Sequence, residues 1–148
     1  MTSKAFYVTT PLYYVNAAPH IGHSYTTVAA DCLARYHRLK GEAVYLLTGT
    51  DEHGQKIEQA ARDSGVDPKA FADRTSEAFK TLWNVLGIRY DRFIRTTDAD
   101  HIQVVQRALQ QLRPQLRQGL SRFFYCVPCE TQWSPGDLSD PNAPTCPS

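Results

Sequence analysis

The sequence contains no apolar run near the length of about 20 residues that a membrane-spanning helix needs. It also has little excess charge, since 16 basic residues stand against 15 acidic ones and the formal net charge is +1. A protein that binds nucleic acid over its whole surface is usually far more basic. The apolar N-terminal segment is interrupted by Thr9, Thr10 and Pro11 and lacks the small-residue cleavage site of a signal peptide. We therefore expect a cytoplasmic protein that binds neither membrane nor DNA, with any RNA contact confined to a local patch.

Cysteine is scarce and unevenly distributed, with four residues in all. Cys32 lies on the apolar side of a helical pattern, so we expect it in the core. Cys126, Cys129 and Cys146 crowd the other end of the chain, which favours a metal motif over a disulfide framework. The first two have the C-x₂-C spacing of structural zinc sites. Free thiols in an irregular tail are the alternative interpretation, and the one we favour for the isolated chain.

Three segments near the N-terminus predict the start of an α/β fold. Residues 5–10 are rich in β-branched and aromatic types and end at Pro11, which predicts a strand. Residues 24–40 predict a helix that Gly41 ends, and residues 43–48 form the unbroken apolar run of a strand buried on both faces of a parallel sheet. The three make one βαβ unit with a right-handed crossover. The apolar residues at helical spacing are Tyr25, Val28, Ala29, Cys32, Leu33, Tyr36 and Leu39.

The middle of the chain is predicted to be mainly helical. The expected elements are a helix over 55–64, a helix from Asp67 to Gly87, a short strand over 91–95 and a fourth helix that Thr97 caps and Pro114 ends. The apolar face of the fourth helix is formed by Ile102, Val105, Leu109 and Leu112. The composition then changes, because no acidic residue follows before Glu130 and residues 133–148 hold four prolines. We therefore divide the chain into 1–112 and a partly irregular region, 113–148.

The segment Pro19-His20-Ile21-Gly22-His23 joins the first strand to the first helix. Ligands of open α/β sheets bind at such junctions, where the helix N-terminus presents free N–H groups and a partial positive charge to phosphate. Gly22 would let a ligand lie against the backbone, because it has no Cβ. Taken alone, His20 and His23 are more often surface or capping residues than a catalytic pair, and a zinc pair is a further alternative. The strand before them, the helix after them and the glycine between them favour a phosphate site.

The tetrapeptide His-Ile-Gly-His resembles the ATP-binding signature of class I aminoacyl-tRNA synthetases. The text from Tyr7 to His23, and the block Leu46-Leu47-Thr48-Gly49-Thr50-Asp51-Glu52-His53-Gly54-Gln55-Lys56-Ile57, are similar to the methionyl-tRNA synthetase family in particular. This similarity extends from about residue 4 to residue 112. It implies the first half of a Rossmann-like parallel-sheet nucleotide-binding fold, followed by the start of a connective insert.

The resemblance also implies roles for individual residues. His20, Gly22 and His23 would bind ATP, and the two histidines would stabilise charge on the phosphates as catalytic groups, with Mg²⁺ assisting. The implied reaction joins methionine to ATP as methionyl-adenylate and then transfers the methionyl group to tRNA(Met).

The second block follows the second strand, so it lies beside the first loop at the same end of the sheet. Asp51 can pair with an ammonium group, whereas Glu52 and His53 taken alone are solvated loop residues or a helix cap. The resemblance implies that Asp51 binds the α-amino group of methionine. Pro11, Leu12 and Tyr14 would then supply apolar walls around the thioether side chain.

The sequence also departs from the family pattern. The family's Lys-Met-Ser-Lys-Ser loop is expected to be absent, because the only methionine is Met1 and no lysine follows Lys80. The cysteines resemble the zinc knuckle of the family's insert, but a fourth ligand would fall one position beyond Ser148. Residues 113–122 replace the usual glycine- and tyrosine-rich segment. We therefore expect an N-terminal fragment that is inactive alone, with a non-ligating ATP- or methionine-binding paralogue and the product of a frameshifted gene as alternatives.

Overall fold

A computed structural model describes residues 4–140, 142 and 144–147 of the chain. The chain forms two compact units, Met1–Gln106 and Arg107–Ser148. None of the described helices is long and apolar enough to cross a membrane.

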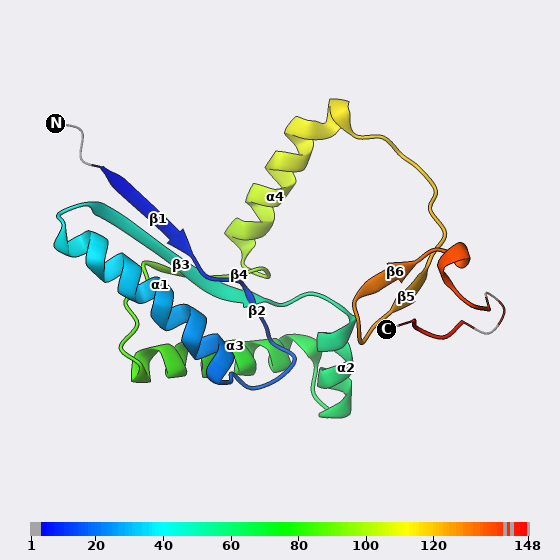
Figure 1. The fold of residues 1–148 in the computed structure, drawn as a ribbon, viewed down its shortest axis with the longest axis horizontal. Coiled ribbons are helices and arrows are strands. Elements are labelled where there is room, and N and C mark those ends of the chain that lie inside the picture. Colours follow the sequence, from blue (N-terminus) through cyan, green and yellow to red (C-terminus); the bar gives the residue numbers. More distant parts are fainter. Residues whose placement is uncertain (1–3, 141, 143, 148) are drawn as a thin grey trace. The chain divides into compact units, whose positions relative to one another are not determined.

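The first unit is built on a parallel sheet (Figure 1). Its strands are β1 (Ala5–Thr9), β2 (Tyr13–Tyr14), β3 (Ala43–Asp51) and β4 (Arg92–Arg95). The strand β3 pairs in parallel with the other three, and its register places Ala5 opposite Ala43, Tyr14 opposite Asp51 and Gly49 opposite Ile94. The predicted α/β class and parallel sheet are therefore confirmed. The short strand β2 lies between the first strand and the first helix, where no strand was predicted.

Four helices follow the predicted order, with shifted ends. They are α1 (Ile21–Leu39), α2 (Gln55–Asp63), α3 (Pro68–Val85) and α4 (Ala99–Leu112). Helix α1 begins before the expected residue 24 because the His20 side chain accepts a hydrogen bond from the Gly22 N–H and caps it. The prediction that Thr97 caps α4 is wrong. The Asp98 carbonyl accepts the hydrogen bond from Ile102 N, while the Thr97 hydroxyl is drawn away to Glu52.

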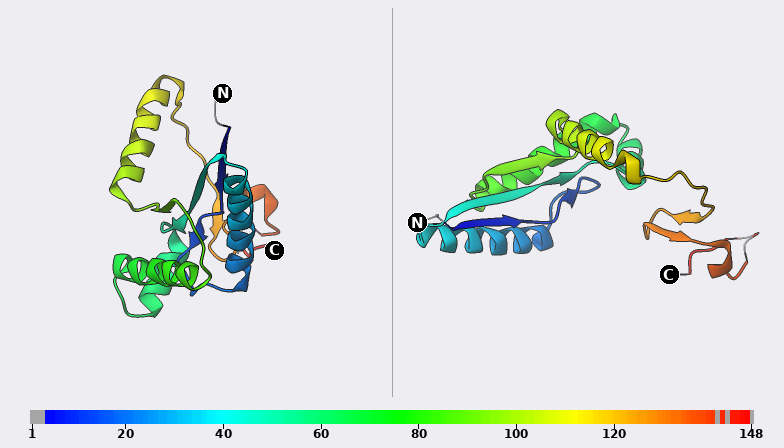
Figure 2. Two further views of the ribbon diagram at one scale, coloured as in Figure 1. Left: turned by 90° about the vertical axis from the view of Figure 1, so that its left-hand side faces the viewer. Right: turned by 90° about the horizontal axis from the view of Figure 1, so that it is seen from above.

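Helices α1 and α3 cover the same face of the sheet (Figure 2). Phe79 and Trp83 of α3 are fully buried against Leu46 of β3 and against the small residues Ala30 and Ala34 of α1. Helix α3 therefore packs on the sheet through Phe79 and Trp83. A second cluster, centred on Val15, Ile57 and Phe71, holds α2 against α3.

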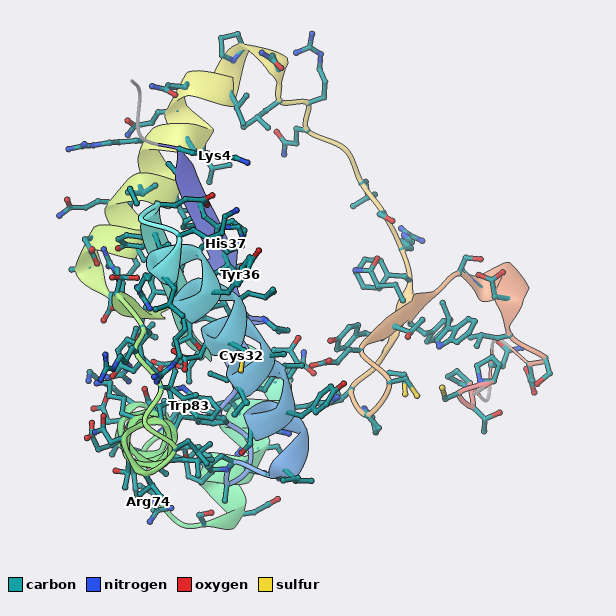
Figure 3. The ribbon with its side chains drawn as sticks, turned by 60° about the vertical axis from the view of Figure 1, so that its left-hand side comes forward. Lys4, Cys32, Tyr36, His37, Arg74 and Trp83 are labelled. Atoms are coloured by element: carbon teal, nitrogen blue, oxygen red, sulfur yellow. The ribbon has the colours of Figure 1, made fainter. Side chains whose placement is uncertain are left out.

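The apolar stripe predicted for α1 is not the stripe that is buried. The buried residues are Thr27, Ala30, Asp31 and Ala34, which share one face at the same helical spacing. Small side chains let the helix lie close to the sheet, and the larger apolar residues therefore remain outside. Cys32 is exposed rather than in the core (Figure 3). The strand β3 is also less buried than expected, since Ala43 and Tyr45 are exposed, and the apolar face of α4 is exposed along its length.

The second unit contains an antiparallel hairpin and two short 3₁₀ turns. The strands β5 (Phe124–Cys126) and β6 (Thr131–Trp133) pair with Cys126 opposite Thr131. The turns span Arg113–Gln115 and Pro135–Asp137. This region has more regular structure than its proline content suggests. Ser148, next to the expected fourth zinc ligand, lies outside the described residues.

Candidate functional site

The two histidines form a reciprocal cap at the N-terminus of α1. His20 Nδ1 accepts a hydrogen bond from Gly22 N at 3.1 Å, and His23 Nδ1 accepts one from His20 N at 3.1 Å. The rings stack with their centroids 3.7 Å apart. The interpretation of the two histidines as capping residues, which the sequence left open, is therefore confirmed. The two capping bonds also fix the direction of both rings.

These bonds decide where the imidazole protons lie. A neutral imidazole that accepts at Nδ1 carries its proton on Nε2, so each ring presents an N–H donor away from the backbone. The pKa of His23 is lowered by burial and, to a lesser degree, by the neighbouring charge of His20. His23 is therefore held in the neutral form with its donor preserved at Nε2. Two such donors beside a helix N-terminus are suited to phosphate oxygens.

Aromatic packing from the core supports His23. Its ring meets Phe79 edge-on at 5.1 Å and Tyr13 at 4.8 Å between centroids. The Tyr13 hydroxyl lies 2.8 Å from the hydroxyls of both Thr26 and Thr27 on the first turns of α1. Tyr13 therefore joins β2 to the N-terminus of α1. The sequence analysis did not assign it a role, although its place between Leu12 and Tyr14 in an aromatic motif was a usable signal.

A cavity of about 390 Å³ brings four of the predicted site residues together. It is lined by Leu12, Tyr13, Tyr14, Asn16, Ala17, His20 and His23. The apolar walls and the imidazole donors thus open into the same space. Small-molecule sites typically combine a mainly apolar lining with a few convergent polar groups in this way.

Three residues predicted for the ATP and methionine sites, Pro11, Gly22 and Asp51, are not among those that line this cavity. Asp51 stands opposite Tyr14 in the register of β2 and β3, so the carboxylate comes from the strand next to the cavity wall. Gly22 lies in the first turn of α1, where an added Cβ would come within 2.9 Å of His20 Cε1. Pro11 is exposed, and its carbonyl accepts a hydrogen bond from the Thr10 hydroxyl.

Beside Asp51 is a buried ionic cluster that the sequence analysis missed. The Glu52 side chain is fully buried and accepts two hydrogen bonds from Arg95, at 2.7 and 2.8 Å. The Thr97 and Thr50 hydroxyls also donate to this carboxylate. Burial alone would raise the pKa of Glu52, but the bonds from Arg95, Thr97 and Thr50 outweigh it and lower the pKa. The interpretation of Glu52, taken alone, as a solvated loop residue or a helix cap is therefore wrong. The available signal was Arg-Thr-Thr at the end of the strand that pairs with β3.

The three C-terminal cysteines meet in the second unit. The Sγ atoms of Cys126, Cys129 and Cys146 all lie within 4.8 Å of one another. Those of Cys129 and Cys146 are 3.6 Å apart. Two thiolates on one tetrahedral zinc are about 3.8 Å apart for Zn–S bonds of about 2.3 Å. The donor set therefore fits zinc in chemistry and in spacing.

Comparison with known proteins identifies the family of the chain. A family model described as tRNA synthetases class I (M) matches residues 6–148. The Methionine--tRNA ligase of Clostridium tetani is 49% identical over 148 residues, which are 99% of this chain and 23% of that protein. The Methionine--tRNA ligase of Streptomyces coelicolor is 52% identical over 141 residues, which are 93% of this chain and 26% of that protein.

Solved structures give the same result. Mycobacterium tuberculosis methionyl-tRNA synthetase in complex with methionyl-adenylate matches with a TM-score of 0.84 and 42% identity, over 88% of this chain and 26% of that chain. The chain spans about a quarter of the length of the curated relatives it matches. On the family match, the sequence identity and the shared fold, this chain belongs to the class I tRNA synthetases of the methionine type.

Proposed function

We propose that this chain supplies the ATP site and part of the methionine site of a cytoplasmic methionine–tRNA ligase. The observation that carries the proposal is the cavity in which the imidazoles of His20 and His23 face the same space as Leu12 and Tyr14. The names of the relatives and the methionyl-adenylate of the solved neighbour support it. The activity belongs to a protein with the length of those relatives, and we expect the isolated chain to be inactive.

In the first step, the methionine carboxylate attacks the α-phosphorus of ATP and pyrophosphate leaves. The substrate is its own nucleophile, so the protein contributes positioning and charge stabilisation. The Nε2 donors of His20 and His23 and the N-terminus of α1 would stabilise the charge that develops on the phosphates, while Gly22 allows close approach. Mg²⁺ would supply further positive charge. In the second step, a terminal ribose hydroxyl of tRNA(Met) takes the methionyl group and AMP leaves.

The methionine substrate needs one charged and one apolar contact. Asp51 would bind its ammonium group, and Leu12, Tyr14 and Pro11 would border the thioether. The register that sets Tyr14 opposite Asp51 supports this division, because it places both groups at the same end of the sheet.

We also propose that Cys126, Cys129 and Cys146 hold a structural zinc ion. The spacing of the three sulfurs and the position of Cys126 and Cys129 at the β5–β6 hairpin support the assignment. The role of the ion would be to tie the hairpin to the segment that follows it.

The test is methionine-dependent ATP–pyrophosphate exchange. Residues 1–148 would replace the matched region of the Clostridium tetani ligase, and the chimera would be compared with its His23→Ala variant. We expect exchange by the chimera and a loss of about 10²–10³-fold in kcat for the variant, the usual cost of one oxyanion donor. Thermal unfolding of both proteins controls for folding. Near-normal exchange by the folded variant contradicts the role of His23, and a chimera that binds both substrates without exchange favours the non-ligating alternative.

A further inference from the structure

The carboxyl ends of β3 and β4 meet at Asp51. These strands are parallel neighbours, with Thr50 opposite Arg95. The pairing continues one residue further, because Thr96 N donates to Thr50 O at 3.1 Å. Thr96 is therefore brought next to Asp51, the last residue of β3.

The Thr96 hydroxyl joins Asp51 to its neighbour. Its oxygen accepts a hydrogen bond from Glu52 N at 2.8 Å and lies 3.3 Å from Asp51 Oδ1. The amide can only donate, so the single hydroxyl proton is free to point to the carboxylate. The bond to Asp51 is thus oriented by the backbone of the residue that follows it.

The buried ion pair holds this arrangement in place. Glu52 is fixed by the bidentate bond from Arg95, which leaves its carboxylate no freedom to turn. Arg95 also donates to Asp73 of α3 at 2.5 Å. The end of β3 that carries Asp51 is therefore anchored to β4 and α3, which do not take part in the chemistry.

We propose that Thr96 is a positioning residue for methionine recognition: it holds Asp51 Oδ1 and so turns Oδ2 toward the substrate ammonium. The inference rests on the proposed function, in which Asp51 receives that ammonium. It assigns to the Thr96 hydroxyl a specific task in binding the amino acid. ATP binding, which depends on α1, is independent of this task.

The experiment uses exchange kinetics of the chimera and its variants Thr96→Val, Thr96→Ser and Thr97→Val. Thr96→Val should raise the KM for methionine about tenfold, the cost of one hydrogen bond to a charged group, and leave the KM for ATP unchanged. Thr96→Ser keeps the hydroxyl and should restore most of the affinity for methionine. Thr97→Val is the matched control, since it removes a hydroxyl that bonds Glu52 instead of Asp51.

Three results would overturn the inference. The first is a Thr96→Val protein with a wild-type KM for methionine. The second is a variant whose two KM values change together with its melting temperature, and the third is an equal effect of Thr97→Val on methionine. A chimera without exchange would overturn the proposed function, and this inference with it. An active chimera whose Thr96→Val variant keeps the wild-type KM for methionine would overturn this inference alone.

Discussion

Replacing Arg95 by methionine would leave a buried charge without its partner. Arg95 gives the fully buried Glu52 carboxylate two of its hydrogen bonds, at 2.7 and 2.8 Å. Methionine keeps an unbranched apolar stem about as far as the position of Nε and removes both donors. Breaking a buried ion pair from one side costs about 3–5 kcal/mol. We expect the free energy of unfolding of the first unit to fall by about this amount at pH 7.

The loss should also depend on pH. In the wild-type chain the pKa of Glu52 is lowered, because hydrogen bonds outweigh the effect of burial. Glu52 therefore adds stability above its unfolded pKa of about 4.3, and this is lost as the pH falls through the folded value. Without Arg95, burial dominates and raises the folded pKa. The variant then loses stability as the pH rises and recovers part of it as Glu52 is protonated. The difference from wild type should be smaller at pH 4 than at pH 7.

Urea unfolding followed by fluorescence of the buried Trp83 measures this difference. A Trp133→Phe background removes the other tryptophan, so that the signal comes from the first unit. The matched control is Arg62→Met, which breaks the exposed pair with Glu58 and should cost about 0.5 kcal/mol or less. A second variant, Glu52→Gln with Arg95→Met, should recover much of the loss. A cost below about 1 kcal/mol, or an equal cost at both pH values, would refute the reasoning.

Two further predictions concern other parts of the chain. Gly49→Ala should prevent stable folding of the first unit, because the new Cβ would lie 1.9 Å from the Ile94 carbonyl oxygen; a cooperative urea transition near wild type would contradict this. The chain should bind one zinc ion through the three clustered cysteines, and cobalt substitution should give thiolate charge-transfer absorption. Cys129→Ser should lose this signal, whereas the matched control Cys32→Ser should keep it, and equal signals in both would argue against the site.

The amino-acid pattern was sufficient for the order of the elements in the first unit, apart from the short strand β2. An uninterrupted β-branched and aromatic run, a glycine after a helix and a proline in a first turn act within a few residues. Such local signals predict β1, α2 and α3 with small errors at their ends. The family motifs likewise occupy continuous stretches, which is why His20, His23 and Asp51 could be named together.

Packing partners were harder to predict from the sequence than the order of the elements, because helical spacing does not say which stripe of a helix is buried. In α1 the large apolar stripe and the small stripe have the same period, and closeness to the sheet selected Ala30 and Ala34. The same limit applied to Cys32, which lies outside.

The sequence by itself determined the α/β class, the family and the position of the His-Ile-Gly-His motif, since each is written in adjacent residues. Only the tertiary structure decided that Glu52 is buried and that Thr96 reaches Asp51. These contacts join residues more than 40 positions apart, and they exist because β3 and β4 end side by side. Strand pairing is a long-range property, and its register places a polar side chain either in water or in a buried network.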